Sequence, residues 1–248
     1  MKKLMLIWFV LSLTILTGQA PQQAAFEEGN KFYQNKEYRK AIEQYELIAN
    51  NNLESTALYF NMGNAYYKTN QLAMAILYYE RALQLSPHDD DVKQNLAIAR
   101  EKTIDRFETV PQPLVRTAYL GILKALTPGS WAALGVLCFL FTLAGTYLYL
   151  FTSRRRPGFV LGSVTLLLGL LALFMALGHQ TYLKNNKPAV VVATSSYIKS
   201  GPSTKAEDVF ILHEGTSAVV TEDFDGWKKI KLPDGKVGWI ESADLIEV

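Results

Sequence analysis

The chain has 248 residues, which is long for one compact domain and leaves room for two small domains with connecting segments. Its 25 Lys and Arg nearly balance 23 Asp and Glu, so the formal net charge of +2 predicts no nucleic-acid partner. Apolar residues make up 49% of the chain and are gathered in a few uninterrupted runs, which is typical of a membrane protein. The composition therefore predicts a multidomain membrane protein.

Residues 1–20 have the pattern of an export signal. Two lysines precede an apolar stretch from Leu4 to Leu16, and small residues follow near Ala20. We expect a signal peptide over 1–20, although Pro21 leaves open whether it is cleaved after Ala20. In either case the lysines hold the front of the segment in the cytoplasm, so residue 25 onward is expected outside it.

The segments 25–48 and 59–82 align with each other at a period of 34 residues, which places Gly29 opposite Gly63 and Tyr45 opposite Tyr79. Such a period predicts two helical hairpins in which each glycine lets the paired helices approach closely. The second copy resembles the tetratricopeptide repeat in eight positions: Tyr59, Met62, Gly63, Tyr66, Ala75, Tyr79, Ala82 and Pro87. We expect a repeat domain over 22–107, with a capping helix that starts at acidic residues 89–91 and has Val92, Leu96, Ala99, Thr103 and Phe107 on one face.

The resemblance implies a concave peptide-binding groove lined by the first helix of each hairpin. An asparagine amide can donate to and accept from a peptide backbone, and a tyrosine offers flat apolar area with a polar tip. The predicted groove residues are Phe26, Asn30, Tyr33, Gln34, Phe60, Asn64, Tyr67 and Lys68. The alternative is that both asparagines are solvated consensus residues. Two repeats are few for a stable solenoid, so we expect support from the membrane, a second copy or a partner.

Two uncharged runs, Trp131–Phe151 and Phe159–Gly178, are each long enough as helices to cross a membrane. We expect transmembrane helices over 131–151 and 159–180, joined by a basic loop over 152–158. Three arginines in that loop, Arg154, Arg155 and Arg156, favour its placement in the cytoplasm. Two crossings return the chain to its starting side, which predicts an inner (cytoplasmic) membrane protein with both soluble domains in the periplasm.

Small residues along the two runs allow the two predicted helices to approach each other closely. The patterns Gly158-x-x-x-Gly162 and Ala172-x-x-x-Ala176 allow close helix contact, either within the hairpin or with a partner. The favoured alternative is that they have no specific role, because small residues are common in any membrane helix. Cys138, the single cysteine, is predicted to be a packing residue. Residues 108–130 are interpreted as a linker or as a segment that lies in the membrane interface.

After Pro188 the sequence changes to short β-rich runs separated by clusters of Gly, Pro, Asp and Ser, which predicts a small antiparallel barrel. The runs "YIKSGPS" and "GTSAVVTEDFDGWKKIKLPDGKVGWI" resemble the bacterial SH3-like domain over 188–248. Domains of that kind bind envelope peptides or proteins. A predicted aromatic surface consists of Tyr197, Trp227 and Trp239, but at least one tryptophan is expected in the core because so small a barrel needs its largest side chains inside.

The three histidines, His88, His179 and His213, fall in separate segments, and no metal-ligand spacing, phosphate loop or activated nucleophile is present. We therefore predict no catalytic residues, no metal, no cofactor and no enzymatic activity. A hydrolase that uses the barrel surface is the weakest alternative.

The order of export signal, helical repeats, two-span hairpin and SH3-like barrel resembles the BatE family of aerotolerance-operon proteins, most closely over "AILYYERALQLSPHDDDVKQNLAIAREK". This resemblance implies a membrane assembly with von Willebrand A-domain proteins and a MoxR-type ATPase system, linked to oxidative-stress tolerance. The predicted function is a lipid-embedded adaptor that presents two periplasmic protein-binding modules. The alternative is an envelope anchor whose SH3-like domain binds cell-wall peptides.

Overall fold

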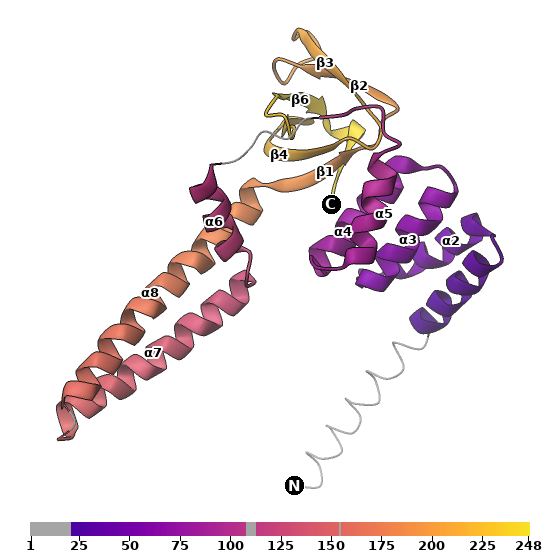
Figure 1. Cartoon of the computed structure of the whole chain (residues 1–248). Coiled ribbons are helices and arrows are strands. Elements are labelled where there is room, and N and C mark those ends of the chain that lie inside the picture. Colours follow the sequence, from indigo (N-terminus) through magenta and orange to yellow (C-terminus); the bar gives the residue numbers. More distant parts are fainter. Residues whose placement is uncertain (1–20, 108–112, 154) are drawn as a thin grey trace. The chain divides into compact units, whose positions relative to one another are not determined.

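The computed structural model describes residues 21–107, 113–153 and 155–248 (Figure 1). The expected signal peptide over 1–20 and Arg154 of the basic loop lie outside the described residues. The chain divides into two compact units. The first unit joins the helical repeats to the segment from Pro188 onward, and the second unit is the helical segment between them.

The repeats consist of two helical hairpins and one further helix, as the 34-residue period predicts. The elements are helical residues 21–34, α2 (Tyr38–Ala49), α3 (Thr56–Lys68), α4 (Leu72–Leu85) and α5 (Asp90–Arg100). The hydroxyl of Ser55 accepts from the Leu58 amide at the start of α3, and the Asp89 carboxylate accepts from the Val92 amide at the start of α5. Both are N-caps that satisfy a free amide of the first helical turn.

Each hairpin is closed by a tyrosine that packs against a glycine of the preceding helix. A Cβ atom added to Gly63 would lie 2.6 Å from the ring of Tyr79, and one added to Gly29 would lie 2.5 Å from the ring of Tyr45. Both tyrosines are almost completely buried. The glycines are therefore required by the close approach of the helices, as the sequence predicts.

The capping helix is shorter than expected. Val92, Leu96 and Ala99 are buried on one face, as predicted, but α5 ends at Arg100. The chain then turns away, and the Thr103 hydroxyl donates to the Arg100 carbonyl at 2.8 Å. The expectation that Thr103 and Phe107 continue the helical face is wrong, because Phe107 packs against the core of the strand region instead.

The segment from Lys187 onward forms a seven-stranded antiparallel sheet, hereafter the sheet domain. Its strands are β1 (Lys187–Val191), β2 (Ser195–Lys199), β3 (Asp208–His213), β4 (Ser217–Phe224), β5 (Trp227–Lys231), β6 (Val237–Glu241) and β7 (Leu245–Glu247). The strand order is β3-β2-β6-β5-β4-β1-β7, so β3 and β7 are the two edges. The all-β prediction is confirmed, but the expected closed barrel is not formed. The two edge strands do not pair with each other, so the sheet stays open.

The sheet domain shares its packing with the repeats. Val190 of β1 is fully buried in the same apolar cluster as the repeat helices, and Val192, Ile246 and Val248 pack against that cluster. The Arg81 guanidinium donates to the Glu247 carbonyl at 3.3 Å. Since apolar burial is the main stabilising contribution in a small domain, the support that two repeats need comes in part from the chain's own strands.

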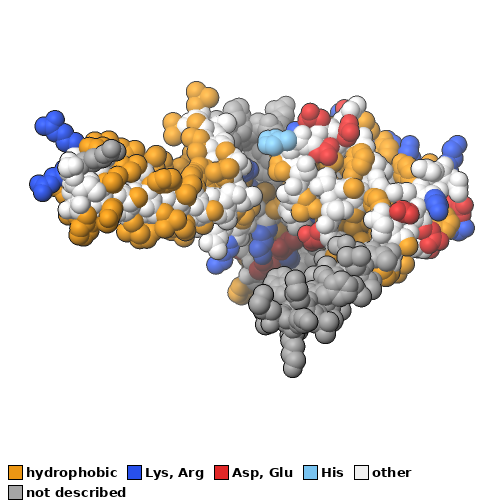
Figure 2. All heavy atoms as spheres, turned by 90° about the horizontal axis from the view of Figure 1, so that it is seen from below, with side chains coloured by type: hydrophobic (Ala, Val, Ile, Leu, Met, Phe, Trp, Pro, Cys, Tyr) orange, Lys and Arg blue, Asp and Glu red, His pale blue; other side chains and the backbone are white. Residues whose placement is uncertain are grey.

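The second unit contains α6 (Leu114–Leu123), α7 (Pro128–Phe151) and α8 (Arg155–Asn185). Helices α7 and α8 are long and apolar enough to cross a membrane. Figure 2 shows hydrophobic side chains over most of the visible face of this hairpin, with Lys and Arg side chains at its far end.

The expected loop over 152–158 is shorter in the structure, because Arg155, Arg156 and Pro157 belong to the first turn of α8, where proline costs no helical hydrogen bond. Helix α8 also runs past residue 180, and the expected linker over 108–130 contains α6.

Helices α7 and α8 meet along their small residues. A Cβ atom added to Gly145 would lie 2.5 Å from the backbone nitrogen of Gly162 and 2.9 Å from the carbonyl oxygen of Gly158. The hydroxyls of Thr142 and Thr165 are 2.9 Å apart. The Gly158-x-x-x-Gly162 pattern is thus used within the hairpin. Cys138 is buried, as predicted for a packing residue.

Candidate peptide-binding site

The repeats contain a cavity of about 430 Å³. It is lined by Tyr33, Asn64, Tyr67, Lys68, Tyr79, Asn95 and Ile98. The cavity therefore gathers the predicted groove residues Tyr33, Asn64, Tyr67 and Lys68. The other predicted residues, Phe26, Asn30, Gln34 and Phe60, do not line it.

Asn64 is held by two hydrogen bonds to its side-chain oxygen. The Tyr79 hydroxyl donates to Asn64 Oδ1 at 2.7 Å, and Asn95 Nδ2 donates to the same atom at 2.8 Å. We call Asn64, Tyr79 and Asn95 the second asparagine cluster.

The same arrangement occurs one repeat earlier. Asn30 Oδ1 accepts from the Tyr45 hydroxyl at 2.7 Å and from Asn61 Nδ2 at 2.9 Å. We call Asn30, Tyr45 and Asn61 the first asparagine cluster. Two copies of one polar arrangement, built by successive repeats, form a regular series along the first helices.

The hydrogen bonds within the clusters determine which hydrogen-bonding atoms of the asparagines are already used. The oxygen of Asn64 already accepts two bonds, whereas within the described part of the chain its amide nitrogen donates to no residue. An amide nitrogen carries two hydrogens, and a peptide backbone offers one carbonyl acceptor per residue. In this orientation the amide nitrogen of Asn64 remains as a donor. The expectation that the asparagines bind a peptide backbone stays a prediction.

Burial keeps the cluster tyrosines protonated. Desolvation, with a further contribution from Tyr33, raises the pKa of Tyr45 to about 12, although the hydrogen bond with Asn61 acts in the opposite direction. Desolvation also raises the pKa of Tyr79 above its ordinary value, helped by Tyr33 and Tyr67. Both hydroxyls are therefore donors at neutral pH, and the orientation of the asparagines does not change with pH in that range.

Two predicted groove residues serve mainly in packing. The rings of Phe26 and Phe60 lie 6.0 and 6.2 Å from the rings of Tyr45 and Tyr79, and both phenylalanines are partly buried against the repeat core. Gln34 is exposed. None of these three side chains lines the cavity.

One end of the cavity is positively charged. Lys68 lines it, and the Lys102 ammonium lies 4.3 Å from the ring centroid of Tyr67, within the range of a cation–π contact. Sequence reasoning missed Asn61, Asn95 and Lys102. The signal was present, because Asn61 and Asn95 are separated by one 34-residue period, as are Lys68 and Lys102.

The predicted aromatic surface of the sheet domain is divided between core and surface. Trp227 is 9% exposed, whereas Tyr197 is 56% exposed. Trp239 is half-buried, and the Lys229 ammonium lies 5.7 Å from its ring centroid. Tyr197 pairs with the exposed Ile211 across β2 and β3, so an outer apolar face is present without Trp227.

Comparison with known proteins supports both modules. Residues 57–89 match the tetratricopeptide repeat family, and residues 194–246 match the bacterial SH3 domain family. The chain is 33% identical to mouse sperm-associated antigen 1 over 105 residues, which are 40% of this chain and 12% of that protein. It is 34% identical to the human protein O-mannosyl-transferase TMTC1 over 83 residues, 34% of this chain and 9% of that protein. The chain thus spans about a tenth of the length of the curated relatives it matches.

Two solved structures are also similar. One is YrrB, described as a TPR protein with an unusual peptide-binding site, at 18% identity and a TM-score of 0.32, covering 66% of this chain and 76% of that one. The other is described as the TPR2AB-domain:pHSP90 complex of yeast Sti1, at 16% identity and a TM-score of 0.22, covering 67% of this chain and 78% of that one. The two family matches define the class: a protein that carries a tetratricopeptide repeat and a bacterial SH3 domain, both of which are protein-interaction modules.

Proposed function

We propose that the protein is a non-enzymatic adaptor, anchored in a membrane, whose repeat groove binds an extended segment of a partner protein. The observation that carries this proposal is the repeated asparagine cluster. Two successive repeats present amide donors at matching positions, and the second cluster lines a cavity of about 430 Å³. Donors at regular spacing suit the regularly spaced carbonyl groups of an extended peptide.

Membrane anchoring is supported by the length and apolar character of α7 and α8. Their outward surfaces carry exposed large apolar side chains such as Phe139, Leu167 and Phe174, which is unfavourable in water and favourable in lipid. Helix α6 exposes Leu114 and Val115, which supports placement of this segment in the membrane interface.

The contacts inside the first unit support a topology with both soluble parts on one side. Residues from before and after the hairpin share one apolar core, so a pair of crossings between them is required if α7 and α8 span the bilayer. Arg155 and Arg156 at the start of α8 favour a cytoplasmic turn. In this proposal the protein lies in the inner membrane and its soluble unit faces the periplasm.

Within this function, the order of modules supports membership in a membrane assembly of the BatE type. Its partners would then be von Willebrand A-domain proteins and a MoxR-type ATPase system, and its role would be in survival of oxidative stress. Two modules on one chain make the second contact intramolecular, so weak individual sites can hold such an assembly together.

The test is cross-linking in membranes, followed by purification of the tagged full-length chain in detergent. The wild type is compared with Asn64→Ala combined with Tyr67→Ala, and with a control in which the exposed Gln34 is replaced by Ala. Stoichiometric partners that are captured by the wild type and the control but lost from the double variant support the groove. Equal capture by all three chains contradicts it, provided that circular dichroism shows the double variant to be folded.

The second candidate function is an envelope anchor that binds cell-wall peptides through the sheet domain. The outer apolar face that contains Tyr197 and Ile211 favours this alternative. Retention of the full-length protein on insoluble wall material, abolished by Tyr197→Ala and unaffected by the groove variant, would establish the anchor in place of the adaptor.

A further inference from the structure

Lys102 is placed at the groove by a segment that is not part of the repeats. Helix α5 ends at Arg100, and the chain from Glu101 to Phe107 is a turn followed by an extended stretch. The Lys102 amide donates to the Ala99 carbonyl at 3.1 Å, so the turn at the end of α5 places its backbone beside Tyr67. The chain leaves the helix directly after this turn, so the contacts that hold residues 103–107 also restrain the conformation at Lys102.

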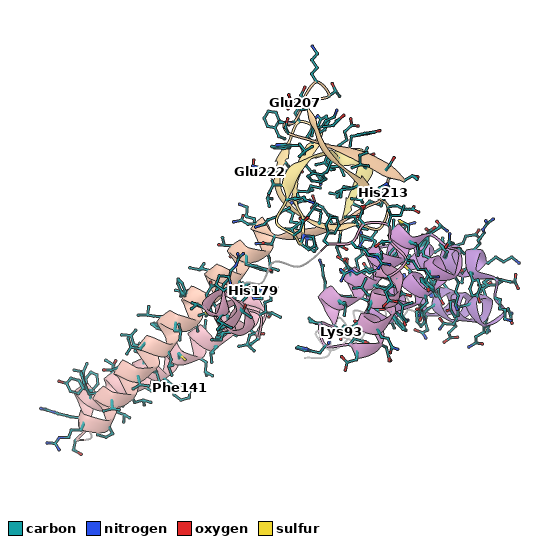
Figure 3. The ribbon with its side chains drawn as sticks, turned by 45° about the horizontal axis from the view of Figure 1, so that its top comes forward. Lys93, Phe141, His179, Glu207, His213 and Glu222 are labelled. Carbon is teal, nitrogen blue, oxygen red and sulfur yellow. The ribbon has the colours of Figure 1, made fainter. Side chains whose placement is uncertain are left out.

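The sheet domain holds that segment through Asp105. One Asp105 oxygen accepts from the His213 backbone amide at 2.7 Å and from the Thr216 hydroxyl at 2.6 Å, and the other lies 2.9 Å from His213 Nδ1. The side chain of Asp105 is 13% exposed, so these contacts are largely shielded from water. Figure 3 shows His213 in the sheet domain.

Apolar contacts fix the same segment on both sides of Asp105. A Cβ atom added to Gly215 would lie 2.8 Å from Thr103 Cγ2 and 3.1 Å from Ile76 Cδ1, so the loop between β3 and β4 sits directly against the segment and against α4. Gly215 has a φ of +84°, a conformation that favours glycine. Phe107 is inserted against the core of the sheet domain.

The charge at this end of the groove indicates what the ligand carries there. Among the described residues that line the cavity, the only charged one is Lys68, and Lys102 adds a second ammonium beside Tyr67. Asn64 of the second asparagine cluster presents its amide nitrogen as a donor in the same wall. Donors and cations without a lining carboxylate complement an acceptor-rich, negatively charged ligand.

We infer that the groove selects peptides with an acidic side chain at the Lys68–Lys102 end, and that the sheet domain maintains this selectivity by holding Lys102 in place through Asp105. This inference rests on the proposed function of the groove. It makes Lys102 a specificity-determining residue and Asp105 a positioning residue that contacts no ligand. The sheet domain thereby sets the specificity of a site that it does not line.

The test uses the full-length chain in detergent and an immobilised array of twelve-residue peptides of randomised sequence. Bound peptides are expected to be enriched in Asp and Glu. For each one resynthesised with Asn or Gln in place of the acidic residue, we expect affinity to fall by about fivefold, the effect of losing one partly exposed ion pair. Lys102→Gln should remove most of this difference in affinity between each acidic peptide and its neutral counterpart.

The positioning role is tested with Asp105→Asn and His213→Ala. Both variants are expected to lose most of the acidic preference but to keep binding of the neutral peptide, a split that general unfolding would not produce. Lys93→Gln is the matched control, because it removes one positive charge from α5 outside the cavity and should retain the full preference.

Three outcomes separate the claims. If no peptide binds, the peptide-binding function and the inference both fail. If peptides bind without acidic preference, the groove stands and the inference fails. If Lys102→Gln removes the preference but Asp105→Asn and His213→Ala keep it, the sheet domain does not set specificity and the inference is overturned in that part.

Discussion

The hydroxyl of Tyr79 donates a hydrogen bond of 2.7 Å to the side-chain oxygen of Asn64. Tyr79 comes from the second helix of its hairpin and Asn64 from the first, so the bond links the buried contact of the two helices to the wall of the cavity. The tyrosine that fills the space beside Gly63 therefore also orients the amide available to a ligand.

Removal of that hydroxyl is expected to affect binding more than folding. Tyr79→Phe keeps the ring in its place but leaves the Asn64 oxygen with one donor, so the amide loses its fixed orientation. We expect a loss of about 1 kcal/mol in stability, the usual contribution of one hydrogen bond, together with weaker binding of groove ligands. Thermal unfolding and peptide titration check the two effects. Tyr38→Phe on α2 is the control, because the Tyr38 ring lies beside that of Tyr33. If Tyr38→Phe weakened binding as much as Tyr79→Phe, the role of Tyr79 in orienting Asn64 would be contradicted.

The glycines of the hairpins should tolerate no side chain. In Gly63→Ala the new methyl group would lie 2.6 Å from the ring of a buried tyrosine, so the helices must separate. We expect destabilisation of about 1–3 kcal/mol, as for other overpacked cores. Gly121→Ala in α6 should not destabilise the protein, because the added Cβ would have no atom within 4 Å apart from its chain neighbours and its own helix backbone. Denaturant unfolding of the full-length variants measures the difference, and equal stability of the two would refute the packing argument.

Attachment of the sheet domain to the segment after α5 should weaken in acid. Burial acts to raise the pKa of Asp105, but hydrogen bonds from Thr216 and His213, with the nearby imidazole, outweigh it and hold that pKa below its ordinary value of 3.8. The ionised carboxylate is thus favoured in the folded state. Its contribution is present above pH 3.8 and is lost as the pH falls through the lower, folded-state pKa.

Asp105→Asn provides the measurement for this pH dependence. The variant should be less stable than the wild type at pH 7, and the difference should shrink as the pH is lowered below about 4. Melting temperatures of both proteins across this range check the sign. A difference that grows in acid would show that Asp105 is not stabilised in its ionised form.

The α7–α8 hairpin should depend on Gly145. In Gly145→Ala the added Cβ would lie 2.5 Å from the backbone of Gly162, and backbone cannot move aside as a flexible side chain can. We expect poor disulfide formation between cysteines placed at positions 142 and 165, in a background where Cys138 is replaced by Ala. Gly129→Ala, whose nearest neighbour atom lies 4.0 Å away, should leave the disulfide yield unchanged.

The two tryptophans of the sheet domain should respond differently to truncation. Trp227→Ala removes a buried side chain and is expected to cost about 3–5 kcal/mol. Trp239→Ala removes a half-buried one, so its cost should be clearly smaller. Chemical unfolding ranks the two variants, and a larger loss for Trp239→Ala would reverse the assignment of core and surface.

Much of the architecture was predictable from local sequence patterns. The 34-residue period gives the hairpins, the apolar runs give α7 and α8, and alternating β-rich runs give the strands, because each pattern reflects burial on a nearby face. The lining of the cavity was predictable in part. Register identifies Tyr33, Asn64, Tyr67 and Lys68, but the orientation of Asn64 depends on Tyr79 and Asn95 from other helices.

Contacts between segments that are distant in the sequence could not be predicted from sequence patterns. Asp105 and His213 are separated by 108 positions, and no period links them. For the same reason the predicted end of α5 was wrong. Phe107 continues the apolar pattern of the helix in the sequence, but in the structure it packs against the core of the sheet domain.

The first unit is assembled from two stretches of chain with the helical hairpin between them, and this has a consequence for biogenesis. The repeats are synthesised before β1 and β7, so the site that buries Val190 stays open until the strands arrive. In the proposed topology the strands arrive on the correct side only when both α7 and α8 have been inserted. A chain with a single inserted span would leave its repeats uncovered, which exposes apolar surface to proteases and chaperones. In that topology the core of the first unit can be completed only after both helices have been inserted.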